Sequence, residues 1–194
     1  RHNPVLNTNL AGRLTKEGKR QAIRGMSAIK GLRIDPDTIW IWPSITARAY
    51  ETGEILAQGL GVPRSRLVPE FTFLDARGFG SYEGQALDKL SEVYAADQID
   101  TSIRPPPFTD GTPNESVNDV FVRVVQLLSK LETQYQGVTV IIVSPDSDNL
   151  TVLQAAMTGL DMRQNHALDF APGEVRMLNL TGSPPAAEED PDEP

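Results

Sequence analysis

Three polar residues that could do chemistry follow directly on the most apolar stretch of the chain. Asp146, Ser147 and Asp148 come just after the run Val138–Ser144. Their oxygen atoms could ligate a metal ion, but the spacing lacks the glycine and the distal glutamate of a calcium loop. Side chains of these types also cap helix N-termini, and the residues from Leu150 onward have helical spacing. We therefore predict a capped helix start here, with no metal and no cofactor.

The elements around this loop place it at one edge of a sheet. Residues 138–143 include five β-branched aliphatic residues and do not alternate with polar ones, which is typical of a parallel strand buried on both faces. In open α/β sheets, ligands bind at the carboxyl ends of such strands. We therefore expect the functional site to lie beside Ser144–Asn149.

Other segments repeat this succession of strands and helices. Strands are predicted over 38–42, ended by Pro43, and over 173–180; helices are predicted over 15–29, 46–59 and 87–94, and from Asn114 onward. This pattern predicts an α/β fold, a three-layer sandwich in which a mostly parallel twisted sheet is flanked by helices. We expect one domain over residues 1–180, followed by an acidic, proline-rich disordered tail over 181–194.

Composition excludes several function classes. The chain has no cysteine, so disulfides and thiol nucleophiles are excluded. The net charge is -8, and five acidic residues of the tail supply much of it. No basic stripe indicates nucleic acid, and no apolar run reaches the roughly 20 residues of a membrane span. The sequence opens at Arg1 without Met, which indicates a processed or partial chain, so any targeting peptide lies outside it.

Five short motifs occur in an order that resembles the histidine phosphatase superfamily, the phosphoglycerate mutase-like proteins. They are Arg1–His2; Leu14, Thr15, Gly18, Gln21 and Ala22; Ser44, Arg48, Ala49 and Thr52; Leu74, Gly80, Glu83 and Gly84; and Glu115, Ser116, Val117, Asp119, Val120 and Arg123. The resemblance spans roughly residues 1–180 and implies the fold predicted above.

The resemblance also implies a reaction, phosphoryl transfer through a covalent phosphohistidine. His2 is then the nucleophile, and Arg1 and Arg48 bind the phosphate in a bidentate manner. In the family a second histidine helps to neutralise the phosphate oxygens, and a carboxyl group protonates the leaving oxygen.

The match fails at the two positions on which that chemistry depends. The family's Ser-His-Gly turn is Ser144–Pro145–Asp146 here, so the second histidine is replaced by a proline. Asp146 and Asp148 would oppose a phosphate by on the order of 1 kcal/mol or more each. Ala76 stands where many members have the glutamate that donates the proton. In the family an apolar strand precedes the Arg-His pair; here either that strand lies outside the given sequence, or the chain is processed at Arg1.

We therefore hypothesise a pseudoenzyme that serves as a binding or structural component, within a larger assembly. Two alternatives stay open. One is a divergent phosphatase in which His2 attacks and Asp75 or Asp146 donates the proton; the other is a sensor that binds a phosphorylated metabolite through Arg1 and Arg48 without cleaving it. His166, the other histidine, is interpreted as a surface or capping residue. Possible partners are a protein and a phosphorylated small molecule, and the pattern around Ser144–Asn149 resembles plastid relatives, which suggests a chloroplast.

Overall fold

Two parallel strands lie at the centre of the computed structural model, which describes residues 12–180. β1 (Ile39–Pro43) pairs with β2 (Thr139–Val143), with Ile39 opposite Thr139 and Pro43 opposite Val143. Isolated bridges from Leu67 and Glu70 extend the pairing along the other edge of β1.

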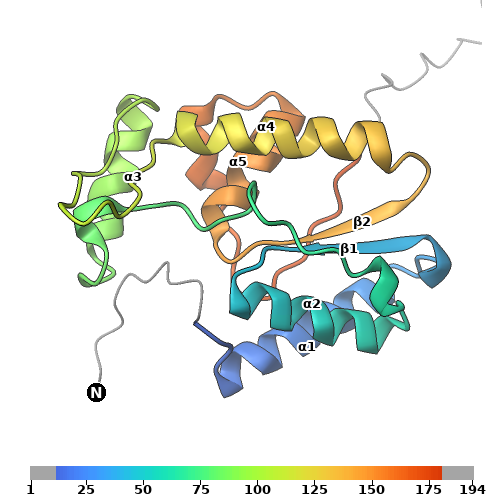
Figure 1. Cartoon of the computed structure of the whole chain (residues 1–194). Helices are drawn as coiled ribbons and strands as arrows, with labels where there is room; N and C mark the ends of the chain where they lie inside the picture. Colours follow the sequence, from blue (N-terminus) through green and yellow to red (C-terminus); the bar gives the residue numbers. More distant parts are fainter. Residues whose placement is uncertain (1–11, 181–194) are drawn as a thin grey trace, which may run out of the picture.

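Helices cover both faces of this sheet (Figure 1). α1 (Lys16–Gly31) and α2 (Ala47–Leu60) lie on one face, and α4 (Val117–Gln134) and α5 (Ser147–Thr158) lie on the other. α3 (Lys89–Ile99) stands at one end of the molecule, and short 3-10 turns occur at η1 (Pro36–Thr38), η2 (Arg64–Arg66), η3 (Gly80–Tyr82) and η4 (Met162–Leu168). The predicted α/β fold with helices on both faces of a parallel sheet is confirmed.

Side-chain caps explain why the helices begin where they do. Thr15 accepts a hydrogen bond from the amide of Gly18 at the start of α1. At α4, Ser116 and Asp119 form a reciprocal capping box. Asp146 accepts from the amide of Asn149, so α5 begins at Ser147, three residues before the predicted Leu150. A cap satisfies amide groups that the first helical turn leaves without partners.

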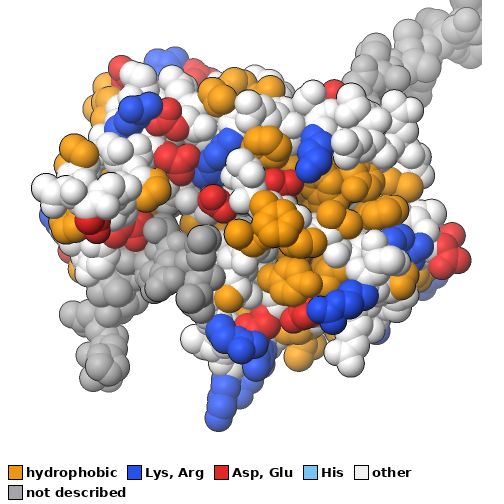
Figure 2. All heavy atoms as spheres, in the orientation of Figure 1, with side chains coloured by type: hydrophobic (Ala, Val, Ile, Leu, Met, Phe, Trp, Pro, Cys, Tyr) orange, Lys and Arg blue, Asp and Glu red, His pale blue; other side chains and the backbone are white. Residues whose placement is uncertain are grey.

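The core is divided between the two faces. Ile29, Ile41 and Leu56 belong to a buried cluster under α1 and α2. Trp42 and Leu127 belong to a second cluster under α4 and α5. Figure 2 shows hydrophobic side chains gathered between the level of α4 and that of α2 on one face of the molecule. No helix within residues 12–180 is both long and apolar enough to cross a bilayer.

One predicted element is wrong. Residues 174–180 run extended but form no strand, and the sheet of the described residues is accordingly smaller than expected. A strand exists only through hydrogen bonds to a neighbouring strand. Among the described residues this segment has none, since β2 pairs with β1 alone. The predicted acidic tail, 181–194, lies outside the described residues.

Candidate functional site

Arg48 and Pro145 meet at the carboxyl ends of the two strands. Arg48 lies in the first turn of α2, and its Nε donates to the carbonyl oxygen of Pro145, 3.2 Å away. Burial lowers the pKa of Arg48, and the negative charges of Asp146 and Glu83 oppose that shift. Two of the residues singled out from the sequence are therefore neighbours, and within residues 12–180 the carboxylates of Asp146 and Glu83 act on Arg48.

Local hydrogen bonds fix the turn that carries Arg48. The amide of Ser44 donates to the carbonyl oxygen of Val143 at 3.0 Å, which ties the end of β1 to the end of β2. The buried hydroxyls of Ser44 and Thr46 lie 3.0 Å apart, and the Thr52 hydroxyl donates to the backbone oxygen of Arg48 at 2.8 Å. α2 and α5 thus begin side by side at one edge, with their N-terminal dipole ends at the site.

The Asp146 carboxylate is held by its own surroundings. It accepts the amide of Arg77 at 2.7 Å, the amide of Asn149 at 3.1 Å and the hydroxyl of Ser144 at 3.2 Å. Burial raises the pKa of Asp146, and the charge of nearby Asp148 raises it further. Asp146 therefore joins the loop after β2 to the glycine-rich loop around residue 77.

Asp148 belongs to a buried ionic group. Arg77, 1% exposed, donates to both carboxylate oxygens of Asp97, at 2.7 and 2.9 Å, and to Asp148 at 3.1 Å. Burial acts to lower the pKa of Arg77, but the two carboxylates outweigh it and raise that pKa above its usual value. We refer to Arg77, Asp97 and Asp148 as the buried ionic group.

The interpretation of His166 as a surface or capping residue is wrong. Its side chain is 6% exposed, and its Nε2 lies 2.7 Å from Asp97. The ring also stacks on Tyr94 at 3.6 Å, and the Tyr94 hydroxyl donates to Asp148 at 2.9 Å. No local sequence pattern predicts this arrangement, because its members lie on separate elements and share no motif.

Asp75 and Ala76 lie on the loop that precedes η3. Burial raises the pKa of Asp75; Arg123 opposes that shift and Glu115 adds to it. Among the described residues, Oδ1 of Asp75 is buried without a hydrogen-bond partner. Ala76, interpreted from the sequence as standing where the family has its proton donor, is half-buried and offers no titratable group. The surroundings of Asp75 thus favour its protonated form, and one of its two carboxylate oxygens lacks a hydrogen-bond partner among the described residues.

The remaining expected site residues, Arg1 and His2, lie outside the described residues. Within 12–180, no cluster of three or more His, Asp or Glu side chains is arranged to hold a metal ion.

Comparison with known proteins adds a family match and similar solved structures. Residues 6–189 match the family model of the histidine phosphatase superfamily, branch 1. A mycobacterial hydrolase aligns with a TM-score of 0.65 at 19% identity, covering 86% of this chain and 78% of its own. A mycobacterial glucosyl-3-phosphoglycerate phosphatase in complex with VO3 gives 0.64 at 21% identity, covering 84% and 78%. The alpha-ribazole phosphatase of Shigella flexneri gives 0.58 at 20% identity, covering 87% and 79%. Comparison with curated proteins gave no match.

Proposed function

Because the chain belongs to the histidine phosphatase superfamily, we propose that it is a member without phosphatase turnover, a pseudoenzyme that serves as a binding or structural component of a larger assembly. The observation that carries the proposal is the contact between Arg48 and Pro145. Where the family's motif provides a second histidine, this turn presents a backbone carbonyl oxygen to the arginine.

The charges around that contact also support the proposal. Phosphoryl transfer needs cationic donors at the oxygens that gain charge. Among the described residues, Asp146 and Glu83 place negative charge near Arg48. Loss of one such donor typically costs about 10²- to 10³-fold in rate. Loss of the general acid, as at Ala76, costs about another 10²- to 10⁴-fold.

One observation favours a second candidate, a divergent phosphatase with His2 as nucleophile. Asp75 has a raised pKa and a buried oxygen without a partner among the described residues, as a proton donor requires. Arg123 and Glu115 dominate its electrostatic surroundings, whereas Asp146 and Glu83 dominate those of Arg48. Because different charged residues act on Asp75 and on Arg48, the observation on Asp75 supports a phosphatase less strongly than the contact between Arg48 and Pro145 supports a pseudoenzyme.

Hydrolysis of an aryl phosphate separates these functions. The pseudoenzyme proposal expects the chain and its His2→Ala variant to show the same background rate. A rate that falls to background only in His2→Ala would overturn it. The control is Arg64→Ala, which removes a side chain that is 82% exposed.

Inorganic phosphate tests whether the site binds without cleaving. The starts of α2 and α5 still offer amide groups and positive dipole ends to an anion. If the chain is a sensor, phosphate raises its melting temperature, Arg48→Ala abolishes the shift, and Arg64→Ala retains it. Absence of any shift leaves the structural role, which then requires a stoichiometric protein partner.

The chloroplast assignment stays a prediction.

A further inference from the structure

The helix α1 carries a concentration of positive charge that the net charge of the chain conceals. Although the chain has a net charge of -8, residues 13–33 include seven of its 18 lysines and arginines and one acid, Glu17. Five of these cations stand on α1 itself, and all five are exposed. We refer to them as the basic face: Lys16, Lys19, Arg20, Arg24 and Lys30. The absence of a basic stripe, expected from the sequence, therefore does not hold for this helix.

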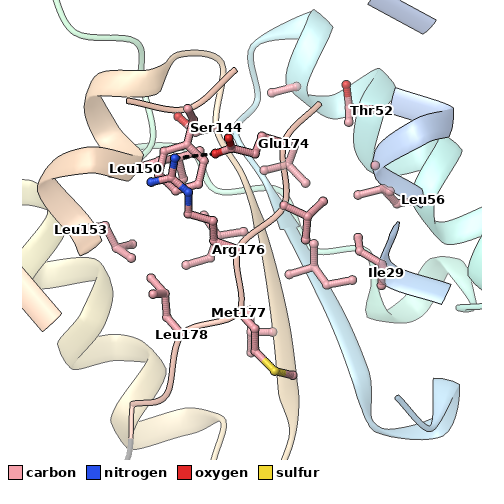
Figure 3. Close-up of a pocket in the computed structure, with 18 of the residues that line it drawn as sticks. Ile29, Thr52, Leu56, Ser144, Leu150, Leu153, Glu174, Arg176, Met177 and Leu178 are labelled. Atoms are coloured by element: carbon pink, nitrogen blue, oxygen red, sulfur yellow. Dashed lines mark ion pairs between the residues drawn. The ribbon is translucent and has the colours of Figure 1, made fainter. Parts of the chain in front are cut away.

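The helical period directs the basic face away from the core. The inner side of α1 buries Ala22, Gly25 and Ile29. Figure 3 shows Ile29 directed into the molecule on the same side of the pocket as Leu56 of α2. With 3.6 residues per turn, the basic face is centred on the opposite side of the helix. In Figure 2, Lys and Arg side chains accordingly project at the lower edge of the molecule, where Figure 1 places α1.

Two carboxylates of the protein pair with three cations of the basic face but leave it positive. Glu17 accepts from Arg20 at 3.3 Å and from Arg24 at 3.5 Å. Glu51 of α2 lies 3.9 Å from Lys19. The side chains of these three cations remain 55% to 70% exposed, and surface ion pairs of this kind contribute little to stability. The cations can therefore turn toward an external anion at little cost.

An exposed aliphatic residue lies among these cations. Ile23 is 49% exposed. Residues three, four and seven positions apart share one side of a helix, so Ile23 lies in line with Lys16 and Lys30 and one turn beyond Arg20. At the end of the helix Leu32 is also exposed, at 46%. Cations that surround an outward apolar residue are typical of helices that lie on the surface of an anionic bilayer.

We propose that the basic face docks on the surface of a bilayer that contains anionic lipids. The cations extend over about 21 Å of helix, so they contact several headgroups at once. Each Lys or Arg at such a surface strengthens partitioning by about fivefold. Ile23 then enters the boundary between headgroups and acyl chains. A nucleic acid backbone would attract the same cations but would leave Ile23 in water, so the bilayer accounts for more of this surface.

Co-sedimentation of the whole chain with vesicles tests the proposal. We expect binding to phosphatidylcholine vesicles that contain about one third phosphatidylserine, no binding to phosphatidylcholine alone, and release at high salt. The double variant Lys16→Gln, Lys30→Gln should lose about tenfold or more in partition coefficient. The control Lys89→Gln, Arg163→Gln removes the same charge from α3 and η4 and should bind as the unchanged chain does. Equal binding by the two double variants, or no binding by the unchanged chain, would overturn the proposal.

The role of Ile23 distinguishes a bilayer from a soluble polyanion. Ile23→Ser should weaken vesicle binding by about fivefold, because a half-exposed isoleucine no longer leaves water. The control Val122→Ser, at an exposed position of α4, should leave binding unchanged. If Ile23→Ser binds vesicles as the unchanged chain does, and duplex DNA or polyglutamate displaces both chains equally, the basic face belongs to a polyanion and the bilayer proposal is refuted.

A fluorescent label measures insertion directly and does not depend on comparing affinities. The chain has no cysteine, so a polarity-sensitive fluorophore can be attached at Ile23→Cys alone. Its emission should shift to the blue when anionic vesicles are added, whereas the same fluorophore at Val122→Cys should not respond. A label at position 23 that stays in water while the chain sediments with the vesicles would contradict docking through this face.

Discussion

At the scale of single residues, the loop after β2 separates two kinds of carboxylate. Asp146 is bound by amides and a hydroxyl, whereas Asp148 is bound by Arg77 and the Tyr94 hydroxyl. Both residues follow Pro145, and neither carboxylate supplies a cation to the loop. The composition of the loop is therefore explained by folding, through a helix cap and a buried charge pair.

The buried ionic group makes Arg77 critical for stability. Removing its charge in Arg77→Met leaves Asp97 and Asp148 buried without their cation, and we expect a loss of about 3–5 kcal/mol in the free energy of unfolding. The control Arg163→Met breaks an exposed pair with Asp161 and should cost less than about 1 kcal/mol. Urea unfolding measures both, and similar losses in the two variants would contradict the assigned role of the buried ionic group.

At the scale of elements, the sequence predicted what local chemistry determines. Thr15 and Ser116 mark the starts of α1 and α4, because a cap acts within one helical turn. Pro43 ends the predicted first strand and is the last residue of β1. The segment 173–180 alternates as a strand does, but pairing requires a partner that no local pattern supplies. The contacts of His166 with Asp97 were hidden for a related reason, since 69 residues separate them.

The start of α4 has a pH-dependent cap. Arg104, together with the amide and hydroxyl of Ser116, lowers the pKa of Asp119 to about 2. The charged carboxylate of Asp119 therefore stabilises the folded state above pH 3.8, the ordinary pKa of an aspartate. This stabilisation is lost as the pH falls toward 2. Asp119→Asn should cost about 1 kcal/mol at pH 7, a difference that shrinks between pH 4 and pH 2. Ser116→Ala, which carries no titrating group, should remain destabilised across that range in chemical denaturation.

The glycine loop before α3 depends on a close backbone approach. Gly80 has φ +56°, and a side chain there would collide with the carbonyl oxygen of Pro106. Gly61, after α2, has φ +71° and open space around it. We expect Gly61→Ala to cost about 1–2 kcal/mol from strain alone. Gly80→Ala should cost about 1–3 kcal/mol more than Gly61→Ala, because its side chain would be overpacked. Equal unfolding midpoints of the two variants in urea would show that the backbone at Pro106 can move away.

At the scale of the whole molecule, two apolar clusters share one thin sheet. Leu56 belongs to the cluster on one face and Leu127 to the cluster on the other. β1 contributes to both, with Ile41 in the first and Trp42 in the second. The two halves therefore cannot separate without exposing the central strand, and we expect them to unfold together.

Unfolding followed by two probes tests this coupling. Leu56→Ala and Leu127→Ala should each cost about 2–5 kcal/mol and shift the same transition in tryptophan fluorescence and in far-ultraviolet circular dichroism. Val122→Ala, at a position 58% exposed on α4, should change stability by less than about 0.5 kcal/mol. Transitions that differ between the probes would show that the two faces unfold independently.

The hydrogen bond from the glycine-rich loop to Asp146 also affects which substitutions this site can accept. The superfamily's turn has glycine at this place, and glycine could not accept the hydrogen bonds that Arg77, Asn149 and Ser144 now donate to the carboxylate. A variant with histidine at position 145 would keep the opposing charge of Asp146, and a variant with glycine at position 146 would lose the hydrogen bonds that join two loops. Introducing the family's histidine and glycine one at a time is therefore disfavoured in either order.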